Sequence, residues 1–127
     1  IRLLEKLKNH SGNQSFLALR PADAAETSVA WKMALENTNS PTGLILSRQG
    51  VKDVPAAKVS RYKEALGAEK GGYLVKEVGN PDVVLIANGS EVTTLMEAAE
   101  ILEAEENLKV NIVISSMQGK PALVASF

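Results

Sequence analysis

Short apolar runs and amphipathic stretches alternate along this chain. Apolar runs at 15–20 and 42–47 flank a stretch from Asp23 to about Asn37 in which apolar residues recur at helical spacing. Asp23 and Glu26 have the spacing of a capping box, with Asp in place of the usual Ser or Thr. The pattern predicts a strand, a helix and a second strand, with the two strands parallel and the crossover right-handed.

A second unit of the same kind follows. Residues 82–87 are continuous, apolar and rich in β-branched side chains, which is typical of a strand buried on both faces. Asn88 can cap the helix that follows, because Glu91 stands three positions further on. Residues 108–115 alternate between apolar and polar and predict another strand, and 73–76 predict a short one.

The two units are too small to be complete sheets. Residues 48–72 lack a clear period, although part of 58–66 could form a short helix. A parallel sheet needs helices on both faces and usually more than two strands. We therefore expect an α/β fold made of two partial three-layer α/β/α domains with mainly parallel strands. The expected division is 1–66 and 80–127, joined by a linker at 67–79.

Composition excludes several classes of function. The net charge of −1, from 14 Lys and Arg against 15 Asp and Glu, offers no strong field for nucleic acid or an anionic membrane. The absence of Cys excludes disulfides and a catalytic thiol, and a single His excludes a multi-histidine metal site. No apolar run approaches the ~20 residues of a membrane span.

Because the chain begins at Ile1 without a signal peptide and ends at Phe127 after an apolar stretch, we expect a piece of a longer intracellular protein.

Most polar positions predict structural roles. Glu97, Glu100 and Glu103 follow one another at helical spacing, which favours a solvated helix face over an acid–base pair. His10 lies in a polar loop and is expected at the surface. Residues 88–90 could offer backbone amides to an anion at a helix start, although capping explains them better.

Arg48 is the strongest candidate for binding. It directly follows the predicted strand at 42–47, and ligands of open α/β sheets gather at the carboxyl ends of strands. Its guanidinium offers a fork of donors suited to phosphate or carboxylate. The alternative is an arginine at the rim, held in a salt bridge, and spacing alone does not separate the two interpretations.

Four stretches, in order and at matching separations, resemble the transketolase family. They are RPAD at 20–23 with the ET and AWK that follow it, PTGLILSRQ at 41–49, KGGY at 70–73 and ANGSEV at 87–92. The resemblance covers about residues 15–117. Gly50 departs from the Asn that the family usually has, and the chain from Gln118 onward does not follow the family's pattern.

The resemblance implies a transketolase, which transfers a two-carbon ketol unit from a ketose phosphate to an aldose phosphate. Such an enzyme would be a cytoplasmic homodimer of the pentose phosphate pathway that uses thiamine diphosphate and a divalent metal, magnesium or calcium. Residues 1–66 would be the end of its pyrimidine-binding domain, and 80–127 the start of its C-terminal domain.

The resemblance also bears on the site residues. The family's thiamine-contacting glutamate, metal ligands and catalytic histidines lie upstream of Ile1, so it assigns no catalytic, cofactor-binding or metal residue here. The segment alone is therefore expected to be inactive and to bind neither cofactor nor metal. The arginine of the family's SRQ stretch contacts the sugar phosphate and corresponds to Arg48, in agreement with its position after a strand.

Two alternatives stay open. A thiamine enzyme like deoxyxylulose-phosphate synthase shares the architecture, although RPAD and SRQ fit transketolase better. A non-catalytic binding or regulatory module derived from such an enzyme is the other. The sequence that precedes Ile1 in the reading frame would separate an enzyme from a module.

Overall fold

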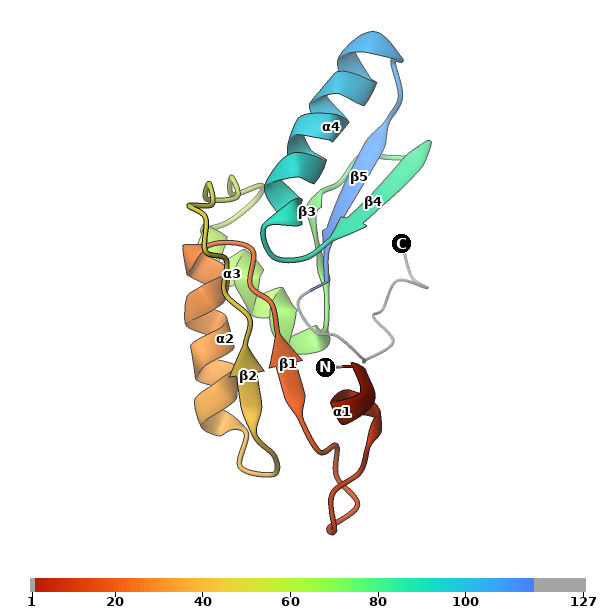
Figure 1. Ribbon diagram of the computed structural model, residues 1–127. Coiled ribbons are helices and arrows are strands. Elements are labelled where there is room, and N and C mark those ends of the chain that lie inside the picture. Colours follow the sequence, from red (N-terminus) through yellow and green to blue (C-terminus); the bar gives the residue numbers. More distant parts are fainter. Residues whose placement is uncertain (1, 116–127) are drawn as a thin grey trace.

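The computed structural model describes residues 2–115, which form two α/β units placed end to end (Figure 1). The first unit holds a two-stranded sheet and the second a three-stranded sheet. This confirms the α/β class with mainly parallel strands in two sheets. The elements in chain order are α1 (Arg2–Lys6), β1 (Leu17–Leu19), α2 (Ala24–Glu36), β2 (Thr42–Leu44), α3 (Arg61–Ala65), the 3₁₀ helix η1 (Leu66–Lys70), β3 (Tyr73–Lys76), β4 (Val83–Ala87), α4 (Glu91–Glu105) and β5 (Val110–Ile114).

The first unit is the predicted strand–helix–strand arrangement. β1 and β2 pair in parallel, with Leu19 opposite Leu44. Asp23 is the N-cap of α2, and its side chain accepts a hydrogen bond from the backbone N–H of Glu26 at 2.8 Å. The Glu26 carboxylate in turn accepts from the backbone N–H of Ala22 at 2.6 Å. The spacing of Asp23 and Glu26 therefore predicted the helix start correctly.

The strand order of the second unit is β3-β5-β4. β5 runs parallel to β4 and antiparallel to β3, so it lies in the centre of the sheet and all of its residues are buried. One of them is polar: the Asn111 side chain accepts a hydrogen bond from the backbone N–H of Val78 at 2.7 Å. The central position explains why this strand, and not β4, is completely enclosed.

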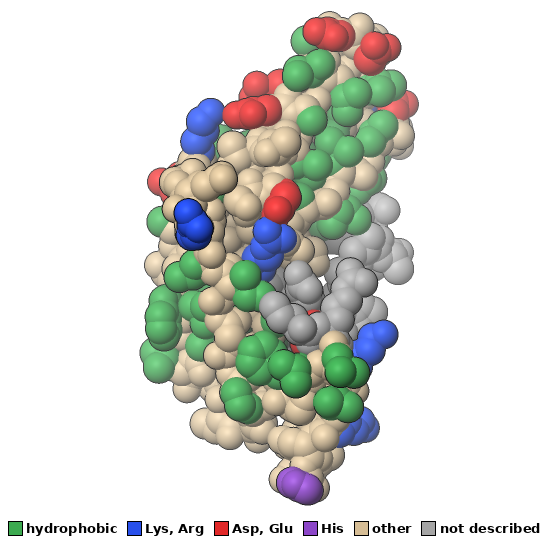
Figure 2. Space-filling model, viewed as in Figure 1, with side chains coloured by type: hydrophobic (Ala, Val, Ile, Leu, Met, Phe, Trp, Pro, Cys, Tyr) green, Lys and Arg blue, Asp and Glu red, His purple; other side chains and the backbone are tan. Residues whose placement is uncertain are grey.

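The prediction that residues 82–87 are buried on both faces was wrong. Val84 and Ile86 are 37% and 45% exposed. β4 lies at the edge of the sheet, and α4 packs against one face of β4 and β5 (Figure 1). Figure 2 shows apolar side chains gathered on the surface of this part of the molecule. A run of β-branched residues thus identified the strand but not its place in the sheet.

One hydrophobic core joins the two units. It includes Val29 from α2, Val54 from the stretch after β2, Ala65 from α3, Tyr73 from β3 and Val92 from α4. α3 falls within the short helix predicted at 58–66. β3 falls within the predicted linker and pairs with β5, so this stretch contributes a strand to the second sheet.

Candidate functional site

The carboxyl ends of β1 and β4 come from different units and meet at the junction between them (Figure 1). Arg20 follows β1, and its guanidinium donates from Nη1 to Asn88 Oδ1 and from Nη2 to Glu91 Oε1, both at 2.8 Å. The backbone N–H of Gly89 donates to the Arg20 carbonyl at 3.1 Å. Because ligands of open α/β sheets bind at strand carboxyl ends, this junction is the candidate site.

The side chain of Arg20 packs closely against the turn after β4. Gly89 has a φ of +56°, and a Cβ built there would lie 2.8 Å from Arg20 Nε. The hydrogen bond from Arg20 holds the pKa of Glu91 below its ordinary value. Sequence analysis missed this role of Arg20, although it follows a buried strand just as Arg48 does.

The prediction that Asn88 caps α4 was wrong. The N-cap of α4 is Ser90, which makes no side-chain capping bond. Asn88 accepts from Arg20 instead, and the Gly89 N–H is occupied by the Arg20 carbonyl, so it is not free to bind an anion. The Asn88 side chain thus bonds Arg20, 68 positions away in the sequence, instead of capping the helix next to it.

Arg48 lies beyond the carboxyl end of β2 and is exposed. The ladder continues one residue past β2, where the backbone N–H of Ile45 donates to the Leu19 carbonyl at 2.8 Å. Within residues 2–115, Arg48 has no hydrogen-bond or ion-pair partner. The salt bridge considered as the alternative is thus not formed among these residues. Arg20 and Arg48 differ in this respect, because the donors of Arg20 are engaged at the junction.

A buried polar cluster underlies the stretch that carries Arg48. Asp23 is 1% exposed, and its Oδ2 accepts from Arg61 Nε at 2.6 Å and from the backbone N–H of Val54 at 3.1 Å. Arg61 Nη2 also donates to the Tyr73 hydroxyl at 2.7 Å. Burial raises the pKa of Tyr73 far above its ordinary value. Burial by itself would lower the pKa of Arg61, but Tyr73 and Asp23 raise it, so this guanidinium stays charged.

Glu97 and Glu100 lie on the exposed side of α4, as predicted, whereas Glu103 is half-buried against Lys76 of β3. Glu97 and Glu100 are exposed, and Glu97 pairs with Lys52 at 3.1 Å, while Glu103 pairs with Lys76. His10 is also at the surface, as predicted. Among residues 2–115 there is no group of three or more His, Asp or Glu side chains that could hold a metal ion.

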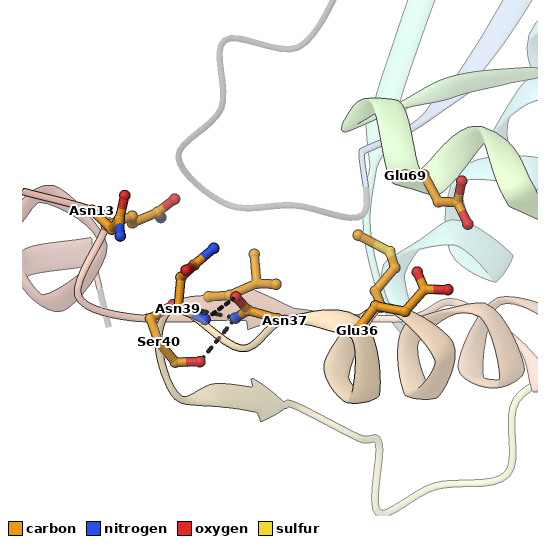
Figure 3. Close-up of a pocket in the computed structure, with 9 residues that line it drawn as sticks. Asn13, Glu36, Asn37, Asn39, Ser40 and Glu69 are labelled. Carbon is orange, nitrogen blue, oxygen red and sulfur yellow. Dashed lines mark hydrogen bonds between the residues drawn. The ribbon is translucent and has the colours of Figure 1, made fainter. Parts of the chain in front are cut away.

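A pocket of about 460 Å³ lies at the other end of the first sheet (Figure 3). It is formed around the start of β1, the end of α2 and the loop before β2, at the opposite end of the two strands from Arg20 and Arg48. The Asn37 amide in its wall donates to the Ser40 carbonyl at 2.9 Å, so it shapes the loop. The lining residues are Asn13, Gln14, Leu17, Met33, Glu36, Asn37, Asn39, Ser40 and Glu69. The amino ends of parallel strands are not where such sheets bind ligands.

Comparison with known proteins identifies the family. A family model described as the transketolase-like TK C-terminal domain matches residues 71–120. A transketolase from Aquifex aeolicus is 45% identical over 96 residues, which are 75% of this chain and 13% of that protein. The chain belongs to the transketolase family. It spans about 13–16% of the length of the curated transketolases it matches.

Solved transketolases share the fold of this family member. A variant transketolase from Pichia stipitis in complex with fructose-6-phosphate superimposes with a TM-score of 0.71 at 31% identity, covering 85% of this chain and 15% of that one. A split-gene transketolase described as an inactive beta4 tetramer superimposes with a TM-score of 0.66 at 30% identity. It covers 91% of this chain and 33% of its own.

None of the helices described in residues 2–115 of this transketolase-family chain is long and apolar enough to cross a bilayer.

Proposed function

We propose that this chain is part of a transketolase that transfers a two-carbon ketol unit from a ketose phosphate to an aldose phosphate. The observation that carries the proposal is the 45% identity to a transketolase over 75% of the chain. Residues 1–66 would end the pyrimidine-binding domain, 67–79 would form the linker, and 80–127 would begin the C-terminal domain. The family model of the C-terminal domain, which matches residues 71–120, supports such a domain in this part of the chain, although it begins inside the proposed linker.

Arg48 would bind the phosphate of the sugar substrate. Its guanidinium is exposed, lies beyond the carboxyl end of β2 and has no partner among the described side chains. A guanidinium can give a phosphate two parallel hydrogen bonds. The Pichia stipitis relative was solved with a sugar phosphate, which supports this class of ligand.

The remaining chemistry would come from outside the described residues. Thiamine diphosphate supplies the electron sink for carbon–carbon bond cleavage in such enzymes when it is bound. The metal ligands would come from another part of the whole protein, in keeping with the absence of a cluster of three or more His, Asp or Glu side chains among residues 2–115. The inactive split-gene tetramer supports the idea that part of a transketolase chain does not suffice for activity. Magnesium or calcium, a homodimer and a cytoplasmic location rest on the family resemblance alone.

Ketol transfer by the whole protein tests the proposal. The complete reading frame that encodes this chain is expressed and assayed with fructose-6-phosphate as donor and an aldose phosphate as acceptor, with and without thiamine diphosphate and magnesium. We expect cofactor-dependent transfer. Consumption of a 2-keto acid donor with loss of carbon dioxide would instead favour the enzyme like deoxyxylulose-phosphate synthase. The absence of any turnover, with no cofactor domain upstream of Ile1, would favour the non-catalytic module.

A further inference from the structure

The part of the chain that carries Arg48, between Ile45 and Val54, has few hydrogen bonds to the rest of the structure, and the Val54 side chain at its far end is buried in the core. Residues 45–60 form neither helix nor strand. On one side of Arg48, the backbone of Ile45 is bonded to β1. On the other side, the first backbone bond to another element is from Val54 N–H to Asp23 Oδ2, at 3.1 Å. The exposed pair of Lys52 and Glu97 adds little, because exposed ion pairs contribute only about 0–1 kcal/mol.

Asp23 is itself held firmly. Its Oδ1 accepts from the backbone N–H of Glu26 at the start of α2, and its Oδ2 accepts from Arg61 Nε at 2.6 Å. The side chain of Asp23 is fully buried, so water does not compete for these bonds. These two hydrogen bonds hold the carboxylate in place, so the oxygen that accepts from the Val54 N–H has a fixed position.

We propose that Asp23 is a positioning residue for substrate binding. By bonding the backbone of Val54, its carboxylate holds the far end of the stretch that carries Arg48 and so fixes where the guanidinium stands. Two parallel hydrogen bonds to a phosphate need a fixed orientation, and a stretch that is ordered beforehand loses less entropy on binding. This inference rests on the proposed role of Arg48 in phosphate binding.

A purely structural role for Asp23 makes a different prediction. As a helix cap and the partner of a buried arginine, Asp23 would stabilise the fold and affect all substrates alike. As a positioning residue, it acts through Arg48 and affects only substrates that carry a phosphate. The two roles are separated by comparing KM for a matched phosphorylated and unphosphorylated substrate.

The test uses the whole enzyme that contains this chain. Asp23→Ser keeps a side-chain acceptor for the helix cap but removes the oxygen that Val54 and Arg61 share. Because this leaves the buried Arg61 without its carboxylate, Asp23→Ser/Arg61→Leu is made as well and carries the same test if the single variant does not fold. Lys32→Gln, which breaks an exposed pair with Glu36 and Glu69, is the control.

We expect both Asp23 variants to raise KM for the phosphorylated substrate by about five- to twentyfold, with kcat and the unphosphorylated substrate little changed. In an enzyme that already carries Arg48→Ala, Asp23→Ser should add almost nothing to KM, because the residue through which it acts is gone. Lys32→Gln should behave like the unmodified enzyme.

Two outcomes overturn the inference and are distinguishable. If Arg48→Ala selectively weakens phosphorylated substrates but the Asp23 variants impair both substrates alike, or add their full effect to Arg48→Ala, Asp23 is only structural and the role of Arg48 stands. If Arg48→Ala shows no selectivity for phosphorylated substrates, the proposed role of Arg48 fails and the positioning role fails with it.

Discussion

Arg48→Ala in the whole enzyme should weaken the use of phosphorylated substrates selectively. Truncation at Cβ removes all the donors of the guanidinium and leaves the backbone of the stretch unchanged. Because Arg48 has no partner within residues 2–115, no bond inside this part of the fold is lost. The expected change in the free energy of unfolding is therefore within about 0.5 kcal/mol.

The size of the effect follows from the bonds to the ligand. A hydrogen bond between charged groups contributes about 1.5–3 kcal/mol net. Arg48 is exposed, so water competes for its donors, and we assign about 1.5–3 kcal/mol to the bidentate pair as a whole. At about 1.4 kcal/mol per decade, kcat/KM should fall by about ten- to 150-fold. The loss should appear mainly in KM, because a phosphate far from the reacting carbons is bound alike in ground and transition states.

Steady-state kinetics on a sugar phosphate and a small unphosphorylated hydroxyaldehyde provide the assay. Arg48→Lys is the matched variant, since it keeps the charge but loses the fork of donors, and it should fall between the wild type and Arg48→Ala. Equal losses on both substrates, together with a lower thermal midpoint, would refute the reasoning. Such a result would mean that Arg48 stabilises the complete protein through a salt bridge.

Three further predictions concern the junction and the cofactor. Gly89→Ala should destabilise the whole protein by about 1–2 kcal/mol, because its φ is +56° and Arg20 Nε would lie 2.8 Å from the new Cβ. Thermal unfolding checks this against Gly79→Ala, where no atom lies within 4 Å, and equal midpoints would contradict it. In an NMR titration, Glu91 should show a pKa below its ordinary value of 4.5 that rises in Arg20→Met. Since folding lowers this pKa, the stability from the pair is present above about pH 4.5 and is lost as the pH falls through the folded pKa. Unchanged titration in Arg20→Met would rule out Arg20 as the cause. The 127-residue chain alone should show no saturable binding of thiamine diphosphate and magnesium by calorimetry, and micromolar binding would contradict the proposed division of the enzyme.

The elements that depend on local interactions could be predicted from the sequence. The start of α2 is such a case, because Asp23 and Glu26 satisfy backbone groups within a few residues of themselves. The parallel pairing of β1 and β2 could be predicted as well, because a 13-residue helix between two strands is a crossover connection of the kind that parallel strands need. The position of Arg48 after a strand needed only the order of the elements, whereas its role stays a prediction.

Tertiary structure decided the features in which distant groups compete with local ones. Asn88 was free to cap α4, but the charged guanidinium of Arg20 offers it a stronger hydrogen bond from the other unit. The order of strands in the second sheet depends on which edges pair after collapse, so a strongly apolar run became the edge strand β4. The contact of Asp23 with Arg61 joins residues 38 positions apart, and nothing in the neighbourhood of either residue indicates the other. A buried charge needs a partner, and only the folded chain decides which one is within reach.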